Sequence, residues 1–173
     1  MDRDGTLIVD KDYLHKPGEV EFFPGALAAC SAAQKAGFLL VLVTNQSGVG
    51  RGYFTMADVE QVHDHIRFEA EKAGAEFSDI YTAPEAPDQP SRGRKPSPQF
   101  LFDARDKHGI DLSNSYMVGD KLIDLECGWN AGVKESFLVR TGYGSKVEKS
   151  GQDLRGSKVF DSIKECVDHL IKK

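Results

Sequence analysis

The chain has 173 residues, of which 40% are hydrophobic and 28% are charged, and its formal net charge is −5 at pH 7. This length suits one compact core, so we expect residues 1–173 to form a single domain. The acidic balance and the scattered Lys and Arg residues argue against a nucleic acid as partner, and no apolar stretch approaches the ~20 residues of a membrane span. No signal peptide precedes the first motif, so we expect a cytoplasmic location. We also expect the protein to be a monomer.

Predicted strands and helices alternate along the chain. Helices are predicted over residues 24–36, 55–73, 97–109 and 125–131, with a C-terminal amphipathic helix carrying the apolar stripe Ile163, Cys166, Val167, Leu170 and Ile171. Strands are predicted over residues 38–43, 77–82, 116–118 and 136–139, and loops over residues 10–23, 46–54 and 83–93. This order predicts an α/β fold, a doubly wound and mostly parallel sheet, in a chain too short for an added large cap domain.

Two carboxylates, Asp2 and Asp4, stand one residue apart just before Gly5 at the beginning of the chain. Side chains at positions i and i+2 of an extended segment point to the same side, so these two converge. Such close carboxylates repel each other unless a cation lies between them or one is protonated. A Mg²⁺ site that joins a nucleophile to a general acid satisfies both conditions, whereas the alternative is an ordinary surface turn.

Three later segments place polar residues at the ends of predicted strands or at the start of predicted helices. The polar residues are Thr44 and Asn45, then Arg94 and Lys95, and finally Asp120, Lys121 and Asp124 after Gly119. Open α/β sheets bind their ligands beyond the carboxyl ends of the strands, which is where these residues are expected.

Taken singly, each of these residues also has a structural explanation. Thr44 suits a turn at a strand end, and Lys95 suits a solvated position ahead of a helix. Asp120 and Asp124 suit the capping of a helix N-terminus. The catalytic interpretation is favoured because all of these positions terminate separate predicted strands or begin helices.

These four blocks, in this order, resemble the haloacid dehalogenase-like phosphatases, whose pattern is DxD, then Thr or Ser, then Lys, then GDxxxD. Segments 44–52, 94–96 and 119–124 are most similar to the branch of histidinol phosphatases and heptose-bisphosphate phosphatases. The resemblance implies Mg²⁺-dependent hydrolysis of a phosphosugar through an aspartyl-phosphate, with the 7-phosphate of a heptose 1,7-bisphosphate as the expected target. Two alternatives stay open, a histidinol-phosphate phosphatase and a phosphosugar-binding protein with impaired catalysis.

The same resemblance implies a role for each matching residue. Asp2 is the expected nucleophile and Asp4 the general acid and base, which calls for a raised pKa on Asp4 while Asp2 stays ionised. The expected catalytic residues are Asp2, Asp4, Thr44 and Lys95. The expected substrate-binding residues are Asn45, Arg51, Arg94 and Lys121, with a solvated surface role as the alternative for Arg51. The expected Mg²⁺ ligands are Asp2, the backbone carbonyl of Asp4 and Asp120, with Asp124 behind them.

Two features depart from the family pattern. The branch carries a zinc-binding cluster of Cys and His before the Arg-Lys pair, but residues 81–94 contain neither residue type, so no zinc is expected. The family also has an apolar strand leading into the first aspartate, where this chain has only Met1. We therefore expect the natural chain to begin upstream, and the chain without that strand to be marginally stable.

The remaining residues with metal-binding or redox chemistry are interpreted as structural. Cys30, Cys127 and Cys166 are widely spaced and lie in predicted helices, where we expect them to fill the core. His63 and His65 cannot share a helix face at a spacing of two, so we expect them to be solvated.

Overall fold

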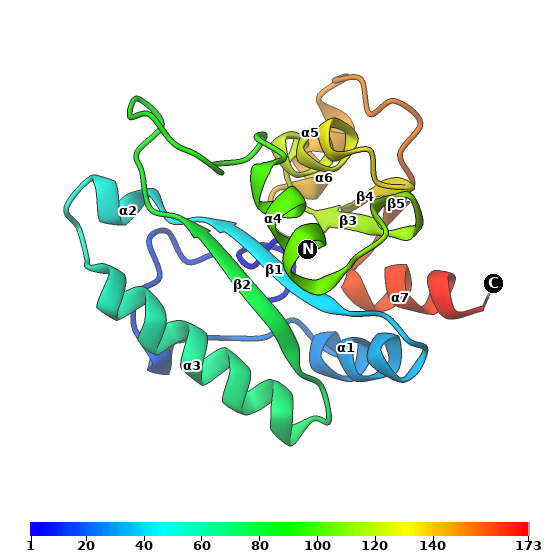
Figure 1. Cartoon of the computed structure of the whole chain (residues 1–173), viewed down its shortest axis with the longest axis horizontal. Coiled ribbons are helices and arrows are strands. Elements are labelled where there is room, and N and C mark those ends of the chain that lie inside the picture. Colours follow the sequence, from blue (N-terminus) through cyan, green and yellow to red (C-terminus); the bar gives the residue numbers. More distant parts are fainter. Residues whose placement is uncertain (173) are drawn as a thin grey trace.

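The computed structural model describes residues 1–172 as two parallel sheets packed between helices (Figure 1). The helices are α1 (Ala26–Lys35), α2 (Ser47–Gly50), α3 (Met56–Lys72), α4 (Gln99–His108), α5 (Leu122–Ala131), α6 (Gly144–Lys149) and α7 (Ile163–Ile171). The strands are β1 (Leu40–Asn45), β2 (Phe77–Ala83), β3 (Tyr116–Gly119), β4 (Glu135–Val139) and β5 (Val159–Phe160). Strand β1 pairs with β2, and β4 lies between β3 and β5, with every pair parallel.

Met1 and Asp2 join the two sheets. Met1 N donates to Val41 O (2.9 Å), and Val43 N donates to Met1 O (2.9 Å), so Met1 pairs with β1. Asp2 N donates to Val118 O (2.9 Å) and thereby reaches β3. Asp2 is therefore held between β1 and β3, at the middle of the molecule.

Helices cover both faces of this framework (Figure 1). Alternate residues of β1 point to opposite faces: Leu42 packs into the larger core with α1, α3 and α7, and Val43 packs into the smaller core with α4 and α5. Each buried apolar side chain contributes about 1.5–3 kcal/mol to folding, so the two cores hold the sheets from both sides. The predicted doubly wound α/β fold is confirmed, and no cap domain is inserted anywhere in residues 1–172.

Most predicted elements are present, and their ends shift by a few residues. The predicted capping of the long helix is confirmed, because Thr55 and Asp58 form a reciprocal capping box at the start of α3. Helix α5 begins three residues earlier than predicted, at Leu122. The sequence analysis missed the short elements α2, α6 and β5. No helix within residues 1–172 has the length and apolarity needed to cross a membrane.

The three cysteines are buried in α1, α5 and α7, as expected. The expectation that His63 is solvated was wrong, because this residue of α3 has a fully buried side chain. An apolar cavity of about 360 Å³ runs beside Met1, between Leu40 and Val41 of β1 and Tyr116 and Met117 of β3.

Helix α5 packs closely on the sheet at Gly128, which generates a first prediction. A Cβ atom at this position would lie 2.2 Å from Ser136 Oγ and 2.7 Å from Met117 Cβ. Alanine gains up to about 1 kcal/mol in helix propensity, but Met117 Cβ is fixed to the backbone and overpacking costs about 1–3 kcal/mol. We expect Gly128→Ala to lower the free energy of unfolding by about 1–2 kcal/mol, measured by urea denaturation.

Gly18 provides the matched control, because a Cβ atom there would meet nothing within 4 Å. Gly18→Ala should change the free energy of unfolding by less than about 0.5 kcal/mol, as surface substitutions usually do. Equal midpoints for Gly128→Ala and the wild type would show that α5 can move away from the sheet.

Candidate active site

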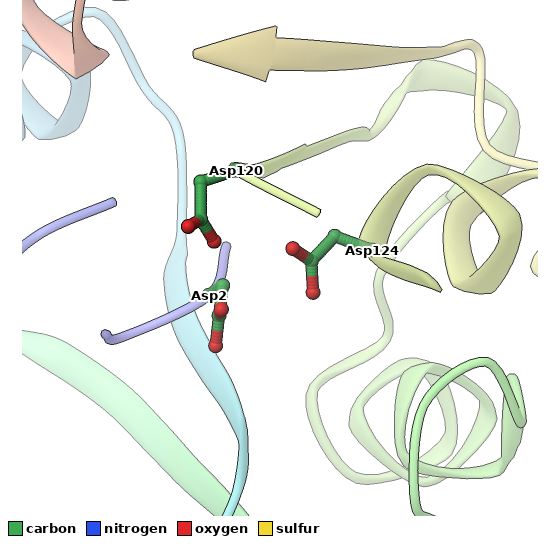
Figure 2. A group of neighbouring side chains, drawn as sticks. All are labelled: Asp2, Asp120 and Asp124. Atoms are coloured by element: carbon green, nitrogen blue, oxygen red, sulfur yellow. The ribbon is translucent and has the colours of Figure 1, made fainter. Parts of the chain in front are cut away.

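Three buried aspartates from separate parts of the chain converge at the carboxyl end of β3 (Figure 2). Asp2 comes from the segment that joins the sheets, Asp120 directly follows β3, and Asp124 lies in the first turn of α5. One carboxylate oxygen from each lies within 4.8 Å of those of the other two. The space beside Asp120 requires glycine at position 5, because a Cβ atom there would lie 2.2 Å from Asp120 Oδ2 and the backbone φ is +81°.

The buried Lys95 ammonium bridges two of these carboxylates. Lys95 Nζ lies 2.6 Å from Asp2 Oδ1 and 2.6 Å from Asp124 Oδ1. The Asn45 side chain fixes the backbone of the same lysine, since Oδ1 accepts from Lys95 N (3.0 Å) and Nδ2 donates to Lys95 O (3.2 Å). Asp124 Oδ2 also accepts from Lys121 N (2.9 Å) and so caps α5. Lys95 is therefore held both at its backbone and at its ammonium group.

The electrostatics of the cluster favour a bound cation. Burial raises the pKa of Asp120 to about 8, and the charges of Asp2 and Asp124 add to the effect. Burial also raises the pKa of Asp2 to about 6, although Lys95 acts in the opposite direction. Asp120 Oδ1 is buried and has no hydrogen-bond partner among the described residues. A set of converging carboxylates with an unpartnered oxygen fits a small, hard divalent cation.

Asp4 has a different environment from Asp2. Arg3 Nε and Nη2 donate to its two oxygens (3.0 and 3.1 Å), and Gln46 Nε2 donates to Oδ2 (2.8 Å). Gln46 Nε2 also donates to Thr44 Oγ1 (2.7 Å), and Thr44 Oγ1 lies 3.4 Å from Asp4 Oδ2. Burial acts to raise the pKa of Asp4, but the Arg3 charge and these hydrogen bonds outweigh it and lower the pKa. With protein groups alone, the pKa of Asp4 is thus lowered while that of Asp2 is raised, and the raised pKa expected for Asp4 beside a bound Mg²⁺ stays a prediction.

A pocket of about 260 Å³ opens beside Asp4. Among the described residues, its lining includes Arg3, Asp4, Asp10, Tyr13, Asn45, Gln46, Phe54, Lys121 and Tyr143. The Lys121 ammonium lies 3.2 Å from Asp10 Oδ2 and 4.6 Å from the centre of the Tyr143 ring. This pocket is the space available to a substrate next to Asp4.

Arg51 and Arg94 lie outside this lining. Arg51 ends α2 and is exposed, while Arg94 Nη1 donates to Glu85 O (3.1 Å) in the loop of residues 83–93. That loop is bonded to α2, because Gly50 N donates to Pro84 O (2.8 Å). Burial lowers the pKa of Arg94, and the nearby charge of Arg51 contributes in the same direction. The two guanidinium groups therefore lie near each other, and their binding of substrate stays a prediction.

Sequence analysis missed Arg3 and Gln46, which both contact Asp4. Both residues lie inside motifs that the analysis had already used, between the two aspartates and directly after Asn45. Alternation along a strand directs the Arg3 side chain away from Asp2 and Asp4, so no contact between Arg3 and Asp4 was expected.

Comparison with known proteins places this geometry in a family. A family model described as HAD-hydrolase-like matches residues 93–166. The heptose 1,7-bisphosphate 7-phosphatase of Vibrio cholerae serotype O1 is 36% identical over 99% of this chain and 95% of its own length. The chain belongs to the heptose-bisphosphate phosphatase branch of the haloacid dehalogenase-like hydrolases. This confirms the predicted branch and identifies the protein as a phosphoric monoester hydrolase.

Other members of the branch support the same assignment. The corresponding phosphatase of Escherichia coli K12 is 41% identical over 82% of this chain and 78% of its own length. A crystal structure of the D,D-heptose 1,7-bisphosphate phosphatase of B. bronchiseptica, in complex with magnesium and phosphate, superposes with a TM-score of 0.93. It is 32% identical in sequence, with 99% of this chain and 96% of that chain covered. The likeness therefore extends across the whole phosphatase fold.

The repulsion among the three aspartates generates a prediction about metal removal. The folded-state pKa of Asp120, about 8, lies above its ordinary value of 3.8. The folded protein then keeps a proton that the unfolded chain releases, so in EDTA the free energy of unfolding should fall as the pH rises through this interval. Mg²⁺ relieves the repulsion, and at 100 times its Kd it should add about 2.7 kcal/mol to stability. We expect the Mg²⁺-induced rise in Tm to increase with pH, measured by scanning fluorimetry.

Asp120→Asn tests the origin of this effect. Above about pH 8, where Asp120 is ionised, the amide removes one buried negative charge, so there the variant should melt higher than the wild type in EDTA. The variant should also gain little from Mg²⁺. Asp64→Asn is the control, because Asp64 is exposed on α3 and, within residues 1–172, pairs only with Arg67. A full Mg²⁺ response in the Asp120 variant would remove Asp120 from the metal site.

Proposed function

We propose that this protein is a Mg²⁺-dependent phosphatase that removes the 7-phosphate of D-glycero-D-manno-heptose 1,7-bisphosphate. The observation that carries the proposal is the buried Asp2–Lys95–Asp124 bridge, whose two aspartates converge with Asp120. A pocket lined by Asp4 opens two residues from Asp2 along the chain. The proposal is supported by two heptose-bisphosphate phosphatases that match this chain along nearly their full length. The crystal structure of one of them contains magnesium and phosphate.

The proposed nucleophile is Asp2. Lys95 Nζ and the backbone N–H of Arg3 both bind its Oδ1, at 2.6 and 2.7 Å, and fix the orientation of the carboxylate. Attack on the phosphorus forms an aspartyl-phosphate on Asp2 and breaks the bond to the sugar oxygen, and water then hydrolyses this acyl phosphate. Lys95 offsets the negative charge that develops on the transferred group, while its second partner, Asp124, prevents the ammonium from moving away.

Asp4 is the proposed general acid and base. It protonates the departing sugar oxygen and afterwards takes a proton from the attacking water. With protein groups alone, Arg3 lowers the pKa of Asp4 and favours the ionised carboxylate. A general acid must be protonated, so the negative charge of the bound phosphate must favour the protonated form of Asp4. Thr44 and Gln46 orient the carboxyl group through the bonds to Oδ2.

The proposed Mg²⁺ ligands are Asp2, Asp120 and the backbone carbonyl of Asp4, with Asp124 holding Lys95. The bound cation supplies Lewis-acid polarisation of the phosphate and relieves the repulsion among the carboxylates. The proposed binding groups for the distal phosphate are Arg51, Arg94 and Lys121, since a bisphosphate places a second dianion away from the reacting one.

A direct assay tests the substrate. With Mg²⁺ present, phosphate release from the heptose 1,7-bisphosphate should exceed release from histidinol phosphate by orders of magnitude in kcat/KM. Asp2→Asn should abolish turnover and leave the fold intact, because an amide is a poor nucleophile and a weaker Mg²⁺ ligand. Faster turnover of histidinol phosphate would assign the protein to the other activity of the branch, and near wild-type turnover by the Asn variant would remove Asp2 from its role.

Arg51→Ala tests the site for the distal phosphate. The distal phosphate takes no part in bond breaking, so we expect KM for the bisphosphate to rise by about tenfold with a smaller change in kcat. The matched control is Arg67→Ala, because Arg67 lies on α3 and pairs with Glu60 and Asp64. An equal effect of Arg51→Ala on a sugar monophosphate would contradict the assignment.

A further inference from the structure

Arg3 is a buried cation with contacts on two sides. Its side chain is 1% exposed, and Nε and Nη2 bind both oxygens of Asp4. The third nitrogen, Nη1, lies 3.2 Å from Nε2 of His63, which is fully buried in α3. A chain of contacts thus leads from α3 through Arg3 to Asp4.

The chemistry of the contact fixes the protonation of His63. A guanidinium only donates hydrogen bonds, so Nε2 of His63 must be the acceptor and must carry no proton. Burial lowers the pKa of His63 to about 3, and the charges of Arg3 and Arg67 add to the effect, so the ring is neutral. Its proton therefore lies on Nδ1, which is 3.5 Å from Glu60 Oε1 and has no hydrogen-bond partner among the described residues. His63 is a neutral acceptor for a buried donor.

We propose that His63 is a positioning residue that holds the Arg3 guanidinium in the plane of the Asp4 carboxylate and thereby aims Asp4 at the leaving oxygen of the substrate. The inference rests on the proposed function, since it assumes that Asp4 protonates the leaving group. Arg3 forms two parallel bonds to Asp4 only in one orientation of its planar group. The His63 contact on the remaining nitrogen selects that orientation.

Loss of the acceptor has a specific consequence. A buried N–H without a partner is costly, so the guanidinium would turn toward another acceptor and give up one of its bonds to Asp4. The carboxyl would then be held by fewer contacts, and a small misplacement of a catalytic group lowers its contribution strongly. Within residues 1–172, His63 forms no hydrogen bond or ion pair with Asp2, Lys95 or Asp120, so nucleophilic attack itself should be preserved.

Two substrates separate these effects. The alkoxide released from a sugar phosphate must be protonated as it leaves, whereas the p-nitrophenolate ion leaves without a proton. The measured quantity is kcat/KM, which reports only the steps up to the aspartyl-phosphate and excludes its later hydrolysis. The heptose 1,7-bisphosphate and p-nitrophenyl phosphate are compared in the wild type and in four variants: His63→Leu, His63→Asn, His63→Gln and His65→Leu.

The variants differ in where they place an acceptor. Leucine offers none, the amide oxygen of asparagine lies near the position of Nδ1, and that of glutamine lies near the position of Nε2. His65→Leu is the control, because His65 is half-buried on the same helix and forms no hydrogen bond or ion pair with Arg3 or Asp4. The asparagine and glutamine pair keeps the test valid if the leucine variant does not fold.

We expect His63→Leu and His63→Asn to lose at least about tenfold in kcat/KM on the bisphosphate, part of the roughly 10²–10⁴-fold that general acid catalysis contributes. On p-nitrophenyl phosphate these variants should stay within about twofold of the wild type, and His63→Gln and His65→Leu should resemble the wild type on both substrates. Parallel losses on both substrates would show a merely structural role, and unchanged turnover of the bisphosphate would show no role.

A measurement on the wild type is independent of the variants. Nitrogen-15 NMR of labelled histidines should show His63 with its proton on Nδ1 and none on Nε2 at neutral pH. A proton on Nε2 would overturn the contact with Arg3, and with it the inference. A wild type that releases phosphate from neither substrate would refute both the proposed function and the role of His63. If the wild type is active but the His63 variants lack the expected difference between the two substrates, only the role of His63 is refuted.

Discussion

The arrangement of the active site depends on one buried ammonium group, that of Lys95. A charged side chain is costly to bury unless it is paired and hydrogen-bonded, and removal of one partner from a buried pair costs about 3–5 kcal/mol. Lys95 meets this requirement through Asp2 and Asp124, while Asn45 holds its backbone. The mutual pairing places the end of β1, the start of α5 and the segment before Gly5 at fixed positions relative to one another.

The convergence of Lys95 and Asp120 was predictable because Lys95 precedes a helix and Asp120 follows a strand, and parallel strands bring such positions to one edge. The place of Asp2 beside them was expected from the family resemblance. The burial of His63 was predictable as well, although the sequence analysis missed it. Val59, His63 and Ile66 follow the helical period and all face the core, but the analysis compared His63 only with His65. His63 belongs to this apolar stripe, whereas its spacing of two from His65 does not determine its burial.

The environment of Asp4 was harder to predict. Alternation along an extended strand directs Arg3 to the side opposite Asp2 and Asp4, but the chain turns at Gly5, where φ is +81°. The long Arg3 side chain instead binds the adjacent carboxylate. Gln46 depends in the same way on the course of the chain after β1, where the short helix α2 replaces a predicted loop. Contacts of this kind follow from local turns, which strand and helix periodicity does not describe.

The hydrogen bonds of Met1 and Asp2 to both sheets link catalysis to the cooperativity of folding. The β1–β2 and β3–β4–β5 sheets share no direct strand pairing in residues 1–172, and the backbone of Met1 and of Asp2, the proposed nucleophile, is hydrogen-bonded to both. Any fluctuation that separates the two sheets also withdraws Asp2 from Asp120 and from Lys95. Amide hydrogen exchange at Val43 and Asp2 would therefore follow the same opening event, and the population of that open state sets the fraction of molecules unable to react.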